Sequence, residues 1–278
     1  MSIKAIFNEF KSQVAFVLLL IWLLAVWHFQ TLNSFLYPLL SVTLVTALDV
    51  VYTRLRYQKW YWPSASFVTG ALIGLIIAPT EPIWIIMVAT LVAFVSKQFI
   101  GAGVRQHIFN PAALGIMTVA LAFGTPVAWW GVTWGKLPLV ILIPVMVRIL
   151  WRMKRLWLSV GFLTIYFIYY LTLFDPKAAF LAIVDGSLLL FALVMLTEPI
   201  TTPAVGNYKF LFGPAVAIVS IGLSRFNLAE VFLPALLTLD LVTFGLRSLN
   251  KKSTQVAVKR KNRSSDQKGA MNDSKKSL

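Results

Sequence analysis

The most constraining feature of this chain is a succession of long apolar runs divided by short polar breaks. A helix that crosses a bilayer needs about 20 mainly apolar residues. Charged residues make up 13% of the chain, against about 25% in a soluble domain. The runs therefore predict an all-α membrane protein of about ten spans, the fifth of them short and tilted or broken. We expect them at residues 13–30, 35–53, 64–79, 82–97, 110–125, 137–151, 156–174, 178–197, 209–224 and 228–247.

Basic residues are distributed unequally between the loops that join these spans. If the N-terminus is cytoplasmic, the outer loops hold only Lys136, Lys177 and Arg225. The inner loops then hold Arg54, Arg56, Lys59, Lys97, Arg105, Arg148, Arg152, Lys154, Arg155 and Lys209. Because Lys and Arg favour the cytoplasmic side, we predict a multi-pass protein of the inner (plasma) membrane with both termini cytoplasmic.

The two ends of the chain are expected to lie outside the bilayer. Residues 1–12 are predicted to form a cytoplasmic N-terminus, followed by an uncleaved helix, because no small-residue cleavage site follows the first run. Residues 249–278 are basic, poor in large apolar side chains and predicted to be disordered. The net charge of +15 therefore indicates attraction to the lipid bilayer, and no nucleic-acid partner is predicted.

The residue types present limit the redox chemistry open to the chain. It contains no cysteine, which excludes cysteine-ligated iron–sulfur clusters and thiolate zinc sites. His28 and His107 fall near opposite faces in the predicted topology, so we exclude a bis-histidine haem and interpret both as interface residues. Any electron transfer would then depend on a flavin or a quinone.

An internal repeat divides the predicted spans into two halves. Thr-Glu-Pro-Ile occurs at residues 80–83 and at 197–200, and "FNPA" at 109–112 matches "FNLA" at 226–229 with the same offset. These matches indicate a duplication, with membrane repeats at 13–125 and 126–248. Since five spans is an odd number, the second repeat is inverted, which places Glu81 outside and Glu198 inside. Inverted repeats are typical of transporters, whose working sites lie at the interface between the repeats.

The repeated tetrapeptide has a structural and a functional interpretation. Thr80 and Thr197 are predicted to N-cap the helices that follow, with Glu in the first turn. For Glu81 this capping role and a functional role are equally open. After Glu198 the polar residues Thr201 and Thr202 favour a stretch that faces a cavity.

The loop before the fifth span has the composition of an anion site. Asn110 is predicted to cap a helix that begins at Pro111, while Gly101 and Gly103 permit close backbone approach. With Lys97 and Arg105 as cations, this helix start is suited to a phosphate. An ordinary basic cytoplasmic loop explains the same residues equally well.

Three acidic residues fall within predicted spans and are candidates for an ion pathway, namely Asp49, Asp185 and Asp240. Asp49 also has a structural interpretation, because Arg54 and Arg56 follow it closely. Asp185 precedes a glycine near the end of its span, so capping or a bend is an alternative. Asp240 is the most deeply placed of the three.

Several motifs in order resemble those of the NqrB/RnfD family. They are "TALDVVYTRLR" at the end of the second span, "FNPAALG" with the glycine-containing loop before it, and "GSLLLFALVMLTEPITTP". Members of this family are membrane subunits of the sodium-pumping NADH:quinone reductase and of the Rnf complex. The resemblance implies a ten-helix, urea-transporter-like inverted repeat, flavin binding, and electron transfer coupled to Na⁺ or H⁺ movement beside other membrane subunits.

The chain departs from the pattern of that family at three points. Family members usually carry Asp where Glu198 stands and Glu where Asp49 stands. They also carry a Ser-Gly-Ala-Thr site whose last Thr takes FMN covalently, whereas Thr69-Gly70-Ala71-Leu72 ends in Leu. We therefore expect no covalent flavin and no metal site, and we expect FMN or riboflavin to bind non-covalently. The alternative is a small-solute channel or transporter on the same scaffold, without redox chemistry.

The predicted cofactor site combines the two loop segments. Both are expected to begin helices on the cytoplasmic side and to line one central site for a flavin or quinone head group. Its residues are Gly101, Gly103, Arg105, Asn110, Pro111, Glu198, Thr201 and Thr202.

Overall fold

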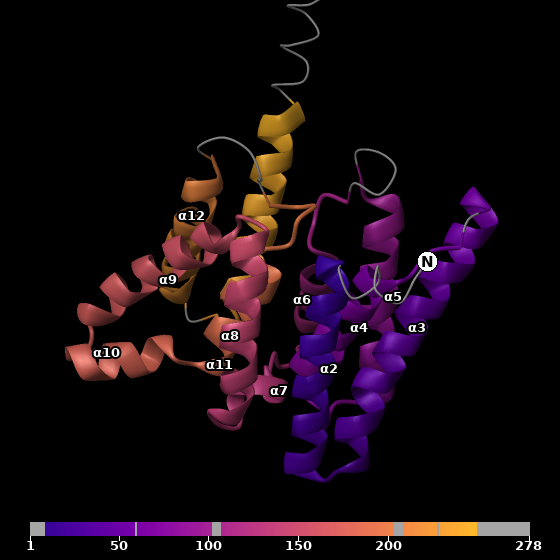
Figure 1. Cartoon of the computed structure of the whole chain (residues 1–278), viewed down its shortest axis with the longest axis horizontal. Helices are drawn as coiled ribbons and strands as arrows, with labels where there is room; N and C mark the ends of the chain where they lie inside the picture. The colour runs from indigo at the N-terminus through magenta and orange to yellow at the C-terminus, as the bar shows by residue number, and fades with distance from the viewer. Residues whose placement is uncertain (1–8, 59, 102–106, 203–207, 227, 249–278) are drawn as a thin grey trace, which may run out of the picture. The chain divides into compact units, whose positions relative to one another are not determined.

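The computed structural model describes residues 9–58, 60–101, 107–202, 208–226 and 228–248. Within these residues the chain is helical, with isolated extended contacts at Ile77–Val127 and Gly101–His107. Two compact units divide it at residues 1–240 and 241–278 (Figure 1). The helices of the first unit are α2 (Phe10–Phe29), α3 (Leu32–Tyr57), α4 (Ser64–Ile76), α5 (Ile83–Phe99), α6 (Pro111–Phe123), α7 (Trp130–Thr133), α8 (Leu137–Arg152), α9 (Leu156–Leu171), α10 (Pro176–Ile183), α11 (Gly186–Leu190), the π-helical turn η1 (Phe191–Met195) and α12 (Tyr208–Ser224). Residues 232–240 are also helical, and the described part of the second unit is helical over 241–248.

Every predicted span overlaps a helical segment, so the all-helical class is confirmed. Two helices, α2 and α3, are long and apolar enough to cross a membrane by length and composition, and the bent pair 176–183 and 186–195 adds a third if it is counted as one span. The ten-helix inverted repeat therefore stays a prediction. The expected disordered tail, Gly103, Arg105 and Pro203 lie outside the described residues, as does Asn227 of the second repeat pair.

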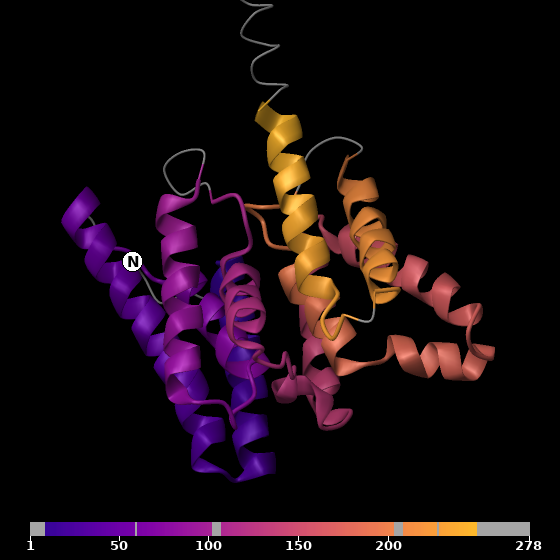
Figure 2. The ribbon, with the colours of Figure 1, turned by 180° about the vertical axis from the view of Figure 1, so that it is seen from behind.

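Glycine allows α3 and α4 to pack at close range. A Cβ atom at Gly70 would lie 2.6 Å from the Val42 Cα atom, and one at Gly74 would lie 2.3 Å from the Pro38 Cα atom. Gly70 and Gly74 are four residues apart and lie on one face of α4, which is the small-residue spacing that brings membrane helices together. In Figures 1 and 2, α2, α3, α4 and α5 lie side by side in the first half of the chain.

The eighth predicted span, 178–197, is helical but bent, which is the alternative that the sequence leaves open at Asp185. α10 and the α11–η1 segment meet at an angle of 54°. Asp185 explains the break, because its Oδ1 atom accepts hydrogen bonds from the backbone N–H groups of Ser187 and Leu188 and starts a new helix. All five residues of η1 are buried.

The predicted capping role of the repeated tetrapeptide is also wrong. α5 begins at Ile83 behind Pro82, without a side-chain cap, so Thr80 and Glu81 precede the helix rather than opening it. Thr197 Oγ1 donates to the carbonyl oxygens of Leu193 and Val194 in the preceding turn. A Thr hydroxyl can either cap the helix that follows it or donate to a carbonyl oxygen of the preceding turn. The Thr197 hydroxyl donates to carbonyl oxygens of η1.

Candidate functional site

The start of α6 is fixed by Asn110, as the sequence predicts. The Asn110 side chain accepts a hydrogen bond from the Ala113 N–H at 3.1 Å, and Pro111 is the first helical residue. The backbone N–H of Asn110 in turn donates to Asp240 Oδ2 at 2.9 Å. The side-chain nitrogen of Asn110, Nδ2, donates to the Met195 carbonyl oxygen at 3.4 Å. Asn110 is only 3% exposed, so one residue ties α6, the end of η1 and Asp240 into a single buried junction.

A histidine–glutamate pair completes this junction. His107 Nε2 lies 3.0 Å from Glu198 Oε1, and the side chains are 3% and 18% exposed. The second oxygen of Glu198, Oε2, is buried and has no hydrogen-bond partner among the described residues. The pair joins the two segments that the sequence predicts to meet.

The electrostatic setting favours an ionised Glu198, in the connection that follows η1. Burial acts to raise the pKa of Glu198, but His107, with Lys11 and Lys97 farther away, acts to lower it. The pKa of Glu198 lies below its ordinary value as a result. Glu198 is therefore a carboxylate at neutral pH.

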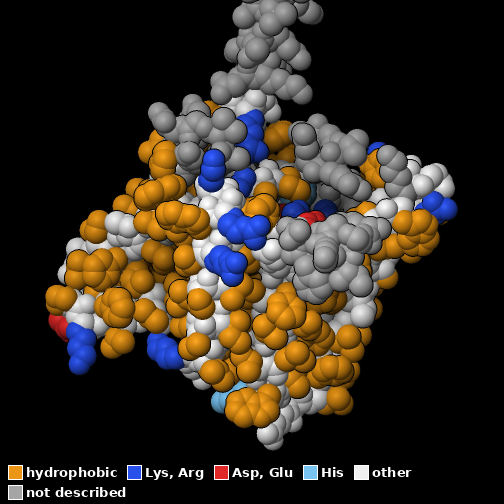
Figure 3. Space-filling view, in the orientation of Figure 1, with side chains coloured by type: hydrophobic (Ala, Val, Ile, Leu, Met, Phe, Trp, Pro, Cys, Tyr) orange, Lys and Arg blue, Asp and Glu red, His pale blue; other side chains and the backbone are white. Residues whose placement is uncertain are grey.

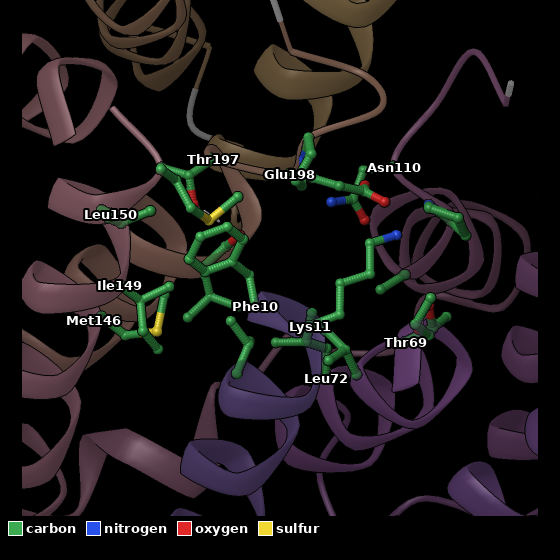
Figure 4. Close-up of a pocket in the computed structure, with 18 residues that line it drawn as sticks. Phe10, Lys11, Thr69, Leu72, Asn110, Met146, Ile149, Leu150, Thr197 and Glu198 are labelled. Atoms are coloured by element: carbon green, nitrogen blue, oxygen red, sulfur yellow. Dashed lines mark hydrogen bonds between the residues drawn. The ribbon is translucent and has the colours of Figure 1, made fainter. Parts of the chain in front are cut away.

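Asn110 and Glu198 line one small pocket with the first turn of α2. Figure 4 shows Lys11 extending toward the two residues, with Phe10 on the side of Thr197 and Leu150. The pocket has a volume of about 70 Å³, which is room for a few water molecules. Its other walls are apolar and come from α4 (Ala65, Val68, Thr69 and Leu72), from α8 and its end (Met146, Ile149, Leu150 and Met153), and from Val14, Pro111, Ala112, Val194, Thr197 and Pro199.

A second, polar cavity of about 200 Å³ lies around Asp49. Lys97 Nζ lies 2.7 Å from Asp49 Oδ2, and the Asp49 side chain is 1% exposed. Tyr61, Ser66 and Gln98 also donate to the Asp49 carboxylate. Asp49 is thus held by Lys97 from α5, and not by Arg54 or Arg56.

The contacts of His107 and Lys11 show that the two cavities are neighbours. His107 lines the cavity around Asp49 while its partner Glu198 lines the small pocket, and Lys11 lines both. The His107–Glu198 pair therefore forms part of the wall between the polar cavity around Asp49 and an apolar pocket.

A buried arginine fixes the backbone after Glu198. Arg155, 7% exposed, donates to the Thr202 hydroxyl at 2.6 Å and to the Pro199 carbonyl oxygen at 3.2 Å. Thr202 Oγ1 donates to the Glu198 carbonyl oxygen at 2.6 Å. Arg155, in the short connection between α8 and α9, therefore positions the whole turn from Glu198 to Thr202.

The structure brings together some of the predicted site residues and separates others. Asn110, Pro111 and Glu198 line the pocket, and Asp240 contacts Asn110. Thr201 and Thr202 are buried but do not line the pocket, whereas Gly101 pairs with His107 in an isolated bridge. The stretch from Glu198 does not begin a helix, contrary to expectation, because residues 199–201 form turns. Asp185 caps α11, which is the structural alternative named for it.

Three residues of the junction are not predicted by the sequence, namely Lys11, His107 and Arg155. From sequence alone each is interpreted as a loop charge or an interface residue. The one signal available is that His107 stands three residues before Asn110, in the same loop.

Comparison with known proteins gives a match to one protein family. Residues 4–136 match the sequence profile of the NQR2, RnfD, RnfE family. The resemblance to that family is confirmed. Together with the apolar helices, it places the chain in a membrane.

Several relatives carry the same name, that of the D subunit of an ion-translocating oxidoreductase complex. The protein from Actinobacillus succinogenes is 27% identical over 94 residues, which cover 33% of this chain and 26% of the relative. That from Cronobacter sakazakii is 25% identical over 107 residues, covering 37% and 31%. That from Tolumonas auensis is 33% identical over 96 residues, covering 33% and 28%. The chain therefore matches about a quarter to a third of the length of these relatives.

Proposed function

We propose that this chain is a membrane subunit of an ion-translocating oxidoreductase complex and works beside other membrane subunits. The family match and the names of the relatives support this assignment. One structural observation assigns the proposed function to particular residues. It is the buried junction of His107, Asn110, Glu198 and Asp240. Three of these residues, His107, Glu198 and Asp240, are ionisable, and ionisable groups in the interior of a membrane protein are typical of ion and proton pathways.

The proposed cofactor is a non-covalent flavin, FMN or riboflavin, whose ring edge contacts Asn110 and Glu198. Glu198 fits, since its Oε2 atom offers a carboxylate acceptor beside the start of α6. The Asn110 N–H and the Asn110 side-chain nitrogen already donate to Asp240 and to the Met195 carbonyl oxygen. The space does not fit in this conformation, because about 70 Å³ is too small for a three-ring system. Binding would require the first turn of α2, with Phe10 and Lys11, to move aside. We derive no electron-transfer step from this closed state.

The proposed ion route, for Na⁺ or H⁺, includes Asp49 and Asp240. Asp49 lines the polar cavity, and Asp240 lies at the junction through the Asn110 N–H. Asp185 is left out of the route because its Oδ1 atom is engaged by the start of α11. In the described state Lys97 neutralises Asp49, so a cation that enters there must compete with the ammonium group.

We also propose the inverted arrangement of two five-helix repeats. The first Thr-Glu-Pro-Ile lies beside the start of α3, which follows the end of α2 closely, and there Asn33 donates to the Pro79 carbonyl oxygen. The second lines a pocket with Phe10 and Lys11 at the start of α2. Twenty helical residues separate these ends, or about 30 Å. Placement at opposite ends of one helix supports opposite sides of the membrane.

An absorption spectrum of the purified full-length chain tests the cofactor proposal, with flavin measured after acid extraction. We expect bound, acid-extractable flavin in the wild type and less of it in Glu198→Gln and in Asn110→Ala. Glu81→Gln is the matched control and should retain the wild-type content. Flavin that survives denaturing electrophoresis would instead show a covalent site.

Equal flavin content in all four proteins would show that Asn110 and Glu198 do not form the flavin site. An absence of flavin combined with solute flux through reconstituted vesicles would favour the channel alternative and would contradict the redox proposal.

A further inference from the structure

A third cavity lies apart from the junction. It is an apolar groove of about 650 Å³ that runs between α2 and α3 and ends at the connection before α4. Its walls are Ala15, Phe16 and Leu19 from α2, Val42, Thr43, Thr46, Ala47 and Val50 from α3, and Phe67 from α4. Ser12, Trp62, Pro63 and Ser64 close its polar end. The volume lies in the range of about 300–1,000 Å³ that is usual for ligand pockets.

The position of the groove decides what kind of molecule fills it. α2 and α3 are the two helices that are long and apolar enough to cross a bilayer. A groove between them opens to hydrocarbon, and Phe16 on its rim is 48% exposed. Figure 3 shows hydrophobic side chains over the outer surface of this region. The acyl chains of surrounding lipids can therefore reach the groove, and they can enter it without removing water from polar groups.

Polar groups gather at one end of the groove only. Glu9 accepts hydrogen bonds from Ser12 at 3.1 Å and from Ser64 at 3.0 Å, which joins the starts of α2 and α4. Trp62 lies at this end and is 51% exposed, as is typical of tryptophan at a headgroup interface. Arg54 does not line the groove but lies one helical turn beyond Val50 on α3, where its guanidinium donates to the Gln58 carbonyl oxygen and lies over the Trp60 ring. An apolar slot with a single polar end, which carries the Glu9 carboxylate and lies near the Arg54 cation, matches an amphiphile with a zwitterionic phosphate head.

One hydroxyl within the groove sets it apart from ordinary helix surface. Thr43 Oγ1 donates to the Leu39 carbonyl oxygen four residues back, which satisfies it. Thr46 Oγ1 is buried and has no partner among the described residues. A buried hydroxyl without a partner is costly, so an oxygen-bearing ligand in the groove would stabilise it.

We propose that this groove binds one acyl chain of a membrane glycerophospholipid, with its phosphate at the end marked by Arg54 and Trp62. Ser64 and Phe67 face the groove, whereas Ala65, Val68 and Thr69 of the same helix line the small pocket. A lipid held there packs against the back of the α4 turn that forms the pocket wall.

Native mass spectrometry of the full-length chain, delipidated stepwise in mild detergent, tests this site. We expect the wild type to retain one phospholipid after the remainder has been removed. Ala47→Trp fills the groove and should lower the retained fraction at least tenfold, and Arg54→Gln should lower it several-fold. Val140→Trp places the same bulk on an exposed position of α8 and should leave retention unchanged.

A second measurement does not depend on the Ala47→Trp variant folding. Because the chain has no cysteine, Ala47→Cys gives a single labelling site for a fluorophore. In vesicles of phosphatidylglycerol and phosphatidylethanolamine, chain-brominated lipid should quench it more slowly on exchange than a label at Val140→Cys. Equal exchange at both labels, unchanged retention in Ala47→Trp, or retention of an isoprenoid quinone in place of a phospholipid would each overturn the proposal.

Discussion

The two copies of Thr-Glu-Pro-Ile are identical in sequence and different in almost every contact. The first is held through its backbone, since the Tyr37 hydroxyl donates to the Glu81 carbonyl oxygen. The second is held through its backbone by Arg155 and Thr202, and in addition through its side chain, since Glu198 pairs with His107. The surroundings therefore decide what a repeated tetrapeptide does, and of the two glutamates Glu198 is the one opposed by a buried histidine.

The segments that follow the two copies explain much of this difference. After Glu81 the chain enters α5 within two residues. After Glu198 it runs through turns to Thr202, where Arg155 holds the backbone. The matched range of the family, residues 4–136, includes the first copy and ends before the second. The proposed junction thus rests on contacts within this chain rather than on the match.

The largest expected difference between the two copies is the side of the membrane on which each copy lies. Single cysteines at Ile83→Cys and Pro199→Cys, both at exposed positions of a cysteine-free chain, should react with an impermeant maleimide from opposite sides of the membrane. Ile83→Cys should be labelled from outside and Pro199→Cys only after permeabilisation. Leu32→Cys and Gln58→Cys serve as outer and inner references. Labelling of both motif cysteines from one side would rule out the inverted repeat.

Removal of Arg155 should have the largest effect on stability. Arg155→Met leaves the Pro199 carbonyl oxygen and the Thr202 hydroxyl without their buried donor. Unsatisfied buried groups cost about 1–3 kcal/mol each, so we expect a loss of about 3 kcal/mol. Thermal unfolding in detergent measures it. Arg148→Met, at an exposed position on α8, should change stability by less than about 0.5 kcal/mol, and an equal loss in both variants would contradict the role given to Arg155.

Glu198→Gln should make the stability of the protein less dependent on pH. The pKa of folded Glu198 lies below its ordinary value because His107, Lys11 and Lys97 outweigh burial. The carboxylate therefore contributes stability above the unfolded pKa of about 4.3, and that stability is lost as the pH falls through the lower folded pKa. At neutral pH we expect Glu198→Gln to cost about 1–2 kcal/mol.

Melting curves from pH 8 to about pH 2 check the sign of this prediction, because the stability is lost only below the unfolded pKa of about 4.3. The gap between wild type and Glu198→Gln should be widest at neutral pH and should narrow on acidification. A gap that widens in acid would mean that Glu198 is protonated in the folded protein.

Asn110→Ala should produce a smaller loss. The substitution removes the cap from α6 and the bond to the Met195 carbonyl oxygen, and we expect a loss of about 1 kcal/mol. Asn110→Asp keeps an acceptor for the Ala113 N–H but adds a charge near Asp240, so it should be no better than Ala. Near-wild-type stability of Asn110→Asp would contradict this prediction, because the added carboxyl group would then meet no repulsion at Asp240.

The sequence predicts the positions of the helices better than their interruptions. Apolar length locates the helical segments, and Asn110-Pro111 marks the start of α6 because cap and first-turn residues act locally. The break at Asp185 is predicted only as an alternative, since one Asp within an apolar run suits a cap and an ion site equally. Thr197 shows the same ambiguity between an N-cap and a backward bond.

The partners in the junction cannot be predicted from the sequence, because they depend on contacts between distant segments. His107 and Glu198 are 91 residues apart, and Asn110 and Asp240 are 130 apart. The sequence indicates that the two loops share one side of the membrane. It holds no signal that a loop histidine, and not Lys97 or Arg105, opposes Glu198, nor that Lys97 is engaged by Asp49.

The smallest expected effect is the one that defines the comparison. Glu81 stands in the same tetrapeptide as Glu198, but it contributes its backbone carbonyl to Tyr37, which any residue at position 81 supplies. Glu81→Gln should therefore shift the free energy of unfolding by less than about 0.5 kcal/mol, the usual range for a surface substitution. It should also leave the pH dependence and the flavin content unchanged. A loss as large as that of Glu198→Gln would show that the carboxylate of the first copy has a partner of its own, and the two halves would then be functionally symmetric.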